Sequence, residues 1–382
     1  MSFDGPSVQN AIYAGGAEWP IAPAEWESRA EEALDPGAFG YIAGGAGAEL
    51  TMRANREAFE RRRLRPRMLT RNRERDLSVN VLGTQSAAPF LLAPVGVLSI
   101  AHPEGELACA RAAAAAGVPF ILSSAASHSI EEIADAMGDA PRWFQLYWIN
   151  DRDVAASFVN RAAKAGYGAI VLTLDTLILG WRPRDLAIAS FPQLKGYCLA
   201  NYFSDPLFRA KLARPPEEDP RAAALQWSIG FSDPGLSWDD LPWLRSLTSL
   251  PLVLKGICHP EDVRRAIDGG VNGIWCSNHG GRQANSGVAA IDMLPGVVEA
   301  AGDVPVIFDS GVRGGEHIVK ALALGATAVA VGRPYAWALS VGGENGIVHM
   351  LLCLLAEADL LMAVNGYPRI ADLTPDAIHV RP

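Results

Sequence analysis

The chain has 382 residues, of which 49 % are hydrophobic and 20 % are charged, so it can bury a sizeable core and does not have a disordered protein's composition. Its net charge of −9 argues against nucleic acid as a partner, because binding phosphates requires a basic face. The five cysteines are widely spaced and form no CxxC pair, so they predict neither a disulfide framework nor a zinc site.

Targeting and membrane signals are weak in this sequence. We find no run of about 18 apolar residues, since Arg111 and Arg333 interrupt the best candidates. The first ten residues lack the basic start and apolar stretch of a signal peptide. We therefore expect a cytoplasmic protein without a membrane partner, and the spacing of its histidines and carboxylates predicts no metal site.

Residues 1–86 precede the regular part of the chain and are interpreted as an N-terminal helical extension. They contain a helical patch at 23–35 and a glycine-rich turn at 44–47. The basic run 61–63 is interpreted as a solvated face rather than an anion site.

From residue 87 onward, short apolar runs alternate with alanine-rich stretches, a pattern typical of parallel strands covered by helices. The expected strands are 89–93, 118–123, 142–147, 168–175, 251–255, 272–277, 304–309 and 326–331. The expected helices lie near 104–116, 129–137, 151–165, 238–247, 260–269, 289–301, 314–324 and 335–341. Eight such units predict an α/β fold, a TIM (β/α)8 barrel over residues 87–382. A doubly wound sheet is the alternative, but it would need GxGxxG after the first strand, where the sequence has Pro94-Val95-Gly96-Val97.

The segment 185–236 is a long insertion after the fourth strand, rich in aromatic residues and proline. A structureless segment of this length inside a compact domain is usually a lid or binding loop. A surface or oligomer-contact excursion is an equally good interpretation. The helix after the insertion has a start signal, a capping box formed by Ser237 and Asp240.

Polar side chains stand at nearly every expected strand end, which is where TIM barrels carry their chemistry. They are Ser123, Gln145, Tyr147, Thr173, Asp175, Lys255, Ser277, His279, Asp309 and Arg333. Each alone could be a turn or capping residue, but their coincidence predicts one site. Two further features, the run Gly311–Gly315 and the pair Gly332-Arg333, predict a phosphate site, because glycines expose backbone N–H groups and arginine supplies a paired donor.

The densest cluster is Ser277–Gln283, with the sequence SNHGGRQ. A histidine titrates near neutrality and can serve as a base, so His279 is the candidate for proton removal. Arg282 can bind a carboxylate with its planar fork, and Asp175 could pair with His279 and stabilise an imidazolium. The alternative, a capping histidine beside a surface ion pair, explains less of this cluster.

SNHGGRQ resembles the active-site signature of the FMN-dependent 2-hydroxy-acid oxidases and dehydrogenases, and the resemblance covers nearly the whole chain. Lys255-Gly256, Phe144–Tyr147 and Asp309–Arg313 carry it further. Other details are similar to the lactate 2-monooxygenase members: SNHGGRQAN, Gly180–Leu186, Arg65–Leu69 and Gly332–Trp337.

The resemblance implies FMN as cofactor, an (S)-2-hydroxy acid and O2 as reactants, and a homo-oligomer, tetramer or octamer. It implies that FMN is held by Ala93, Ser123, Gln145, Thr173, Lys255, Asp309, Gly311, Arg313, Gly332 and Arg333. It implies that His279 is the base, oriented by Asp175, with Lys255 and Tyr147 completing the catalytic set. It implies that the substrate is bound by Tyr41, Tyr147, Arg182 and Arg282, with Ala125 in the pocket wall.

Three departures from the family pattern bear on the substrate and on oxygen. Ala125 stands where many relatives have an aromatic residue, which predicts a wider pocket, and Trp148 could reshape the same wall. Asn285 replaces a commoner Asp and recurs in the monooxygenases. The expected activity is oxidation of lactate or a larger analogue with decarboxylation. Alternatives are a simple oxidase that releases hydrogen peroxide, on larger or aromatic acids, and a non-catalytic flavin-binding barrel.

Overall fold

The computed structural model describes residues 4–381 except 190 and 232, and its centre is a closed barrel of eight parallel strands. The strands are β4 (Phe90–Leu92), β5 (Phe120–Ser123), β6 (Arg142–Tyr147), β7 (Ile170–Thr173), β8 (Leu252–Lys255), β9 (Gly273–Cys276), β10 (Val306–Phe308) and β11 (Ala328–Val331). They follow one another around the barrel in chain order, and β11 pairs with β4 to close it. The predicted TIM barrel is confirmed, with every strand inside its expected range.

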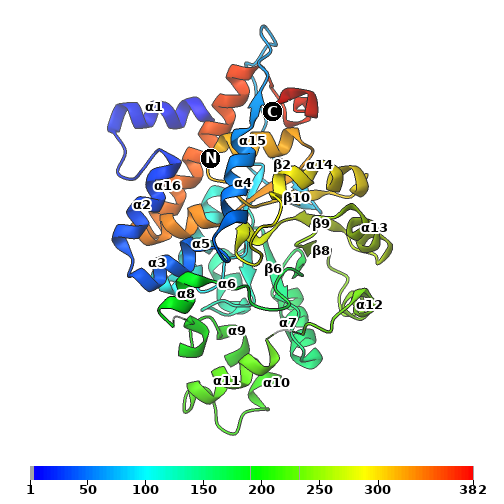
Figure 1. The fold of residues 1–382 in the computed structure, drawn as a ribbon. Coiled ribbons are helices and arrows are strands. Elements are labelled where there is room, and N and C mark those ends of the chain that lie inside the picture. Colours follow the sequence, from blue (N-terminus) through cyan, green and yellow to red (C-terminus); the bar gives the residue numbers. More distant parts are fainter. Residues whose placement is uncertain (1–3, 190, 232, 382) are drawn as a thin grey trace.

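A ring of helices covers the barrel, as Figure 1 shows. They are α5 (Gly105–Ala116), α6 (Ile130–Met137), α7 (Arg152–Lys164), α12 (Leu241–Ser246), α13 (Pro260–Asp268), α14 (Ala290–Ala301), α15 (Gly315–Ala323) and α16 (Arg333–Asn365). Side-chain caps fix several starts: Ser129 and Glu132 form a capping box on α6, and Asp151 caps α7. The predicted Ser237–Asp240 box is present on the short 3₁₀ helix η3 (Trp238–Asp240), which leads into α12.

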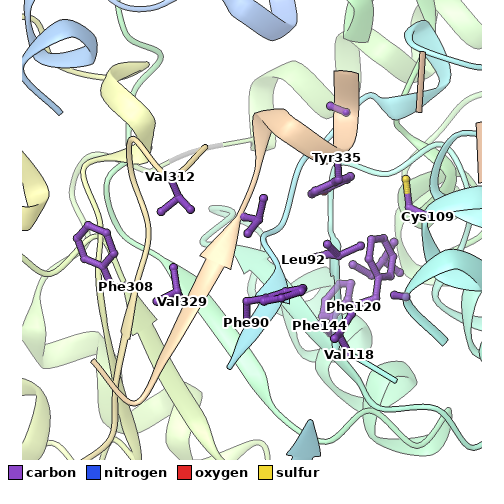
Figure 2. Packing of buried hydrophobic residues seen from close by; sticks show 14 of the residues in the cluster. Phe90, Leu92, Cys109, Val118, Phe120, Phe144, Phe308, Val312, Val329 and Tyr335 are labelled. Carbon is purple, nitrogen blue, oxygen red and sulfur yellow. The ribbon is translucent and has the colours of Figure 1, made fainter. Parts of the chain in front are cut away.

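The buried side chains form two layers because strand residues alternate in direction. One set, including Trp143, Val171 and Trp275, fills the barrel interior. The other set lies between strands and helices, where Phe90, Phe120 and their neighbours pack as in Figure 2. The strands are therefore buried on both faces, which explains their continuous apolar sequences.

The N-terminal extension contains more than helices. It has α1 (Gly5–Gly15), α2 (Pro23–Ala33), α3 (Pro36–Ala43) and α4 (Leu50–Glu60), of which α2 matches the predicted patch. Three short strands were not expected: β1 (Arg62–Leu64), which pairs with the C-terminal β12 (Ile378–Val380), and the hairpin β2 (Val79–Val81) with β3 (Thr84–Ser86). The hairpin packs its valines against the barrel interior and so covers one end of it.

The basic run 61–63 is only partly solvated, which corrects the sequence interpretation. Arg62 is buried, donates to the Ala58 carbonyl and pairs with Asp292 at 2.6 Å. The local pattern could not reveal this, because the partner is 230 residues away along the chain.

About half of the insertion 185–236 forms short helices, which corrects the expectation of a structureless segment. Its elements are α8 (Pro183–Ala187), η2 (Pro192–Lys195), α9 (Ala200–Phe203), α10 (Pro206–Arg209) and α11 (Pro220–Gly230). Figure 1 shows α9, α10 and α11 in green at the bottom of the view, far from the chain termini. Aromatic contacts hold them together: Phe191 lies 6.2 Å from Trp227, and Tyr202 lies 5.5 Å from Phe208, between ring centroids.

The helix α16 is much longer than the predicted 335–341 and has a kink at Gly343. By length and composition it could cross a membrane, with a mean hydropathy of 2.1 over 18 residues, but half of that window is buried within the fold. Arg333 stands at its first residue and so does not interrupt the apolar stretch, contrary to the sequence interpretation. The helix packs against α5, α2 and α15, as the core helix of a globular fold does.

Candidate active site

A cavity opens where the barrel strands end, and most of the residues predicted for the site line it. Its lining includes Tyr41, Ala93, Ala125, Tyr147, Arg182, Lys255, His279, Arg282, Asp309, Gly311, Arg313, Gly332 and Arg333. Two unpredicted insertion residues, Gln193 and Phe231, line it as well. The barrel topology therefore brings together residues that lie up to 292 positions apart between Tyr41 and Arg333.

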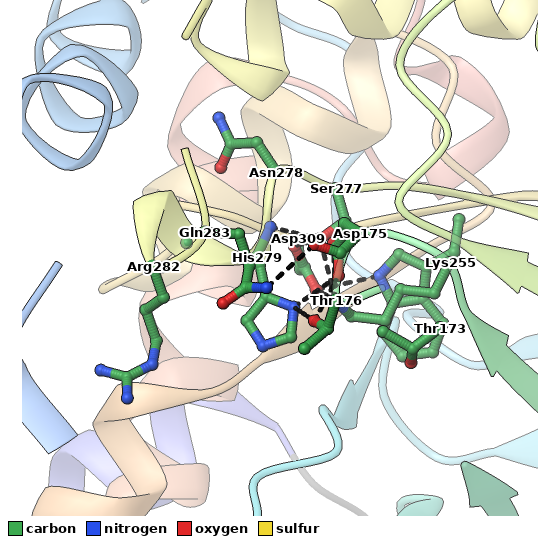
Figure 3. Close-up of polar contacts among 12 residues, drawn as sticks. Thr173, Asp175, Thr176, Lys255, Ser277, Asn278, His279, Arg282, Gln283 and Asp309 are labelled. Atoms are coloured by element: carbon green, nitrogen blue, oxygen red, sulfur yellow. Dashed lines mark hydrogen bonds and ion pairs between the residues drawn. The ribbon is translucent and has the colours of Figure 1, made fainter. Parts of the chain in front are cut away.

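His279 and Asp175 form a tight pair at the ends of β9 and β7. The His279 Nδ1 atom lies 2.7 Å from Asp175 Oδ1, and Figure 3 shows the ring and the carboxylate facing each other. A carboxylate beside Nδ1 places the ring proton there and leaves Nε2 as the free base. His279 adopts a φ of 56°, and Gly280 and Gly281 follow with positive φ, so the ring stands out from the strand end.

A buried network of hydrogen bonds, which the sequence analysis did not predict, holds the backbone of His279 in place. Ser277 Oγ accepts from the His279 backbone N–H at 3.0 Å and donates to Asp309 Oδ1 at 2.5 Å. Trp275 Nε1 donates to Asp309 Oδ2 at 3.1 Å. Lys255 Nζ donates to Ser277 Oγ at 3.1 Å and lies 3.6 Å from Asp175 Oδ2. Lys255 is thus a buried cation between two carboxylates.

The charges of this group decide its protonation. Burial lowers the pKa of His279 below its ordinary value, against the opposing effect of Asp175, so the ring is neutral at pH 7. Burial alone would raise the pKa of Asp175, but His279 and Lys255 hold it well below its usual range. Burial also acts to lower the pKa of Lys255, but Asp175 and Asp309 raise it, so the ammonium stays charged. The site holds a neutral base beside a fixed ion pair.

Ser123, Gln145 and Thr173 lie side by side on the neighbouring strands β5, β6 and β7. Ser123 Oγ donates to Gln145 Oε1 at 2.8 Å, and Gln145 Nε2 donates to Thr173 Oγ1 at 2.9 Å. All three are buried, and they do not line the cavity among the described residues. Their roles toward a cofactor stay predictions.

Three arginines gather on one side of the cavity without a carboxylate partner among the described residues. Arg282 and Arg333 both donate to the Gly44 carbonyl at 2.8 Å, so the predicted glycine-rich turn serves as their acceptor. Arg182 donates to Gln283 Oε1 at 2.5 Å. Burial, then Arg182, lowers the pKa of Arg282 to about 9, and burial, then Arg313, lowers that of Arg333 to about 9. Arg282 and Arg333 remain charged at pH 7, so this side attracts anions.

The predicted phosphate end is built around Arg313. Burial lowers the pKa of this guanidinium to about 10, and its Nε has no hydrogen-bond partner in the described part of the chain. Gly311 adopts a φ of 88°, and a Cβ there would meet the Asn55 backbone at 3.0 Å. Another N–H of the same guanidinium donates to the Val312 carbonyl at 2.9 Å, and no carboxylate pairs with it among the described residues. A guanidinium without a carboxylate partner beside a glycine turn is suited to binding phosphate.

Two tyrosines face the cavity from different elements. Tyr41 comes from α3, and the Arg282 guanidinium lies 5.0 Å from the centre of its ring. Tyr147 ends β6, its ring lies 5.3 Å from that of Phe231, and burial raises the pKa of its hydroxyl well above the usual value. The Tyr147 hydroxyl is therefore a neutral donor at pH 7.

The structure shows the surroundings of the three residues that depart from the family pattern. Ala125 lines the cavity, and the wider pocket expected there stays a prediction. Trp148 does not reshape that wall: it stacks on Trp243 at 6.5 Å between ring centroids and is outside the lining. Asn285 Oδ1 accepts from the Leu50 N–H at 3.0 Å at the start of α4. This hydrogen bond connects the loop that follows the Ser277–Gln283 signature to the N-terminal extension.

Comparison with known proteins gives the family. A family model described as FMN-dependent dehydrogenase matches residues 30–380. The chain belongs to the FMN-dependent dehydrogenase family. It is 42 % identical over 358 residues to L-lactate oxidase of Lysinibacillus sphaericus (strain C3-41), covering 94 % of this chain and 92 % of that one. It is 41 % identical over 361 residues to 2-hydroxyacid oxidase 1 of Homo sapiens, covering 94 % and 96 %. The crystal structure of mandelate oxidase matches with a TM-score of 0.83 and 37 % identity, covering 94 % and 98 %.

Membership of the FMN-dependent dehydrogenase family makes this protein an FMN-dependent oxidoreductase of 2-hydroxy acids. The residues present fit FMN. Arg313 and Arg333 bond to backbone carbonyls and have no carboxylate partner among the described residues, so their positive charge is available for its phosphate, and the cavity runs from them to the strand ends where Lys255 and His279 lie. The sequence resemblance predicted this family and cofactor correctly.

Proposed function

We propose that this protein oxidises an (S)-2-hydroxy acid, lactate or a larger analogue, and holds the 2-oxo acid until it is oxidatively decarboxylated. From lactate and O2 the products would be acetate, carbon dioxide and water. The observation that carries this proposal is the insertion, which covers one side of the cavity with Gln193 and Phe231. A covered site keeps its product longer than an open one, because release must wait for the cover to move.

His279 is assigned the removal of the substrate's 2-hydroxyl proton. Its Nδ1 faces Asp175 at 2.7 Å, so Nε2 is the nitrogen that accepts the proton. Asp175 then stabilises the imidazolium without taking its proton, because the pKa of this carboxyl is held well below its usual value.

The substrate carboxylate is assigned to Arg182 and Arg282, with the Tyr41 and Tyr147 hydroxyls as further donors. Arg282 already stands beside Tyr41, and all four side chains line the cavity. A planar carboxylate bound by two guanidinium groups has few orientations left, so its 2-carbon would be presented in one geometry.

Bound FMN would supply a two-electron acceptor that O2 afterwards reoxidises. Its phosphate would be held by Arg313 and Arg333, and the glycines 311 and 332 leave room for the chain that leads to it. Lys255 contributes a buried positive charge at the strand ends, which stabilises negative charge developing beside it.

A simple oxidase that releases 2-oxo acid and hydrogen peroxide is the second candidate. The names of two relatives, L-lactate oxidase and 2-hydroxyacid oxidase 1, favour it. The space at Ala125 and the likeness to mandelate oxidase favour substrates larger than lactate in either case.

The experiment that separates the two candidates follows the fate of oxygen. The FMN-loaded protein is bleached anaerobically with a panel of 2-hydroxy acids, and the best substrate is then turned over in air. Carbon dioxide equal to the substrate consumed, with little peroxide, is expected. Stoichiometric peroxide would overturn the decarboxylation proposal and establish the oxidase.

A further inference from the structure

Gln193 is an insertion residue that reaches the carboxylate-binding side of the cavity. It lies in η2 and is only 6 % exposed, and its side-chain Nε2 donates to the Tyr41 hydroxyl oxygen at 3.2 Å. Its own Oε1 is buried and has no partner within the described part of the chain. A buried amide that leaves its oxygen unpaired is costly to the fold, so a functional reason for its position is called for.

The direction of this hydrogen bond determines what Tyr41 can do. An amide N–H only donates, so the Tyr41 oxygen is the acceptor and its hydroxyl hydrogen is free to point elsewhere. Arg282, the cation over the Tyr41 ring, has no acceptor atom to offer. The hydroxyl is therefore left for an acceptor that enters the cavity, and a carboxylate is such a group.

The rest of the insertion holds Gln193 independently of Tyr41. Its neighbour Phe191 lies against Trp227, and Trp227 lies 4.8 Å from Phe231 between ring centroids. Phe231 in turn contacts Tyr147. The insertion thus touches both cavity tyrosines, one through a hydrogen bond and one through a ring contact.

We propose that Gln193 is a positioning residue that turns the Tyr41 hydroxyl toward the carboxylate of the 2-hydroxy acid and of the 2-oxo acid product. The proposal rests on the carboxylate role assigned to Tyr41 under the proposed function. If so, the insertion is part of the substrate site, because its Gln193 side chain orients the Tyr41 hydroxyl, which donates to the substrate.

Two substitutions test the bond from opposite directions. Gln193→Met removes the donor at similar volume, and losing one neutral hydrogen bond of this kind should raise KM by about 3–10-fold with kcat nearly unchanged. Gln193→Glu reverses the bond, because a carboxylate accepts the Tyr41 proton and repels an incoming anion. Its KM should exceed that of Gln193→Met, and the ratio to the parent KM should fall as the pH is lowered and the new carboxyl becomes a donor again.

The control is Gln226→Met, the same chemical change in α11 of the same insertion, at a residue that does not line the cavity. Its KM should equal the parent's. The readout is the substrate dependence of anaerobic flavin reduction, in which the half-saturation concentration and the limiting rate take the places of KM and kcat. Calorimetric binding of the 2-oxo acid accompanies it, and its Kd should rise in parallel with the half-saturation concentration. Neither measurement depends on the fate of oxygen.

A double-mutant cycle isolates the coupling. In a Tyr41→Phe background, Gln193→Met should cause no further loss. An unchanged KM in Gln193→Met, or a full additional loss in the Tyr41→Phe background, would overturn the inference while leaving the reaction itself in place. Stoichiometric peroxide from the parent would overturn decarboxylation only, and an effect of Tyr41→Phe on stability alone would remove the carboxylate role on which the inference rests.

Discussion

Replacing His279 with glutamine removes the proposed base while keeping a hydrogen-bond donor toward Asp175. In the native site, protonation of His279 creates an imidazolium 2.7 Å from the Asp175 carboxylate. At an effective dielectric near 20 that pair gains on the order of 4–6 kcal/mol. Burial opposes the gain, as the lowered pKa of His279 indicates. Because the pKa of His279 is lowered overall, burial outweighs that gain, so the expected loss is taken from the general-base contribution of roughly 10²–10⁴-fold, about 2.7–5.4 kcal/mol.

The pH dependence supplies a second signature of the same group. A base whose pKa lies below 6.5 stays neutral to lower pH than an ordinary histidine. The parent's kcat/KM should therefore be flat near neutrality and fall only as the pH drops through that lowered value. In His279→Gln this acid limb should disappear, because glutamine does not titrate.

The assay is anaerobic stopped-flow reduction of the bound flavin by substrate, measured from pH 4.5 to 8. Flavin content and the thermal midpoint establish that the variant is folded and loaded. His259→Gln, which alters a histidine that caps α13 outside the cavity, is the matched control and should keep the parent's rate. Reduction of His279→Gln within tenfold of the parent, or an acid limb that persists in it, would refute the assignment of the base.

The remaining predictions concern the carboxylate, the pocket and the phosphate end. Arg282→Lys keeps a charge but loses the fork over Tyr41, so kcat/KM for the 2-hydroxy acid should fall about 10–100-fold in steady-state assays while the melting temperature is unchanged; equal kcat/KM would exclude the clamp. Ala125→Trp fills the wall of the cavity and should shift selectivity toward small acids by a graded 1–3 kcal/mol or so, measured as the ratio of kcat/KM for lactate and a longer acid; no shift would mean that Ala125 does not meet the substrate. Arg313→Met removes a guanidinium that has no carboxylate partner among the described residues, and should weaken FMN binding about 10–100-fold in titrations of the apoprotein, without lowering the stability of that apoprotein; retained affinity would mean that the phosphate binds elsewhere.

The local sequence pattern was sufficient to predict the barrel fold and the polar residues at its strand ends. Each strand is buried on both faces, so its apolar run and the helix after it are visible without tertiary information. The βα order then places every strand end at one face, which is why His279, Lys255 and Arg313 could be assigned to one site from their positions alone. The motif resemblance identified the family for the same reason, since SNHGGRQ concentrates several of these residues in one loop.

Contacts between distant segments were decided only by the tertiary structure. The pairing of β1 with β12, the burial of Arg62 beside Asp292 and the covering hairpin leave no local pattern, because each depends on a partner far along the chain. The insertion shows this most clearly. Its sequence contains no periodic signal long enough to predict short helices, and nothing near Gln193 points to Tyr41, 152 residues away. A hydrogen bond of this kind exists only once the barrel has brought its two segments together. The sequence therefore determined which residues the proposed reaction would use, and the packing determined which segments cover and orient them.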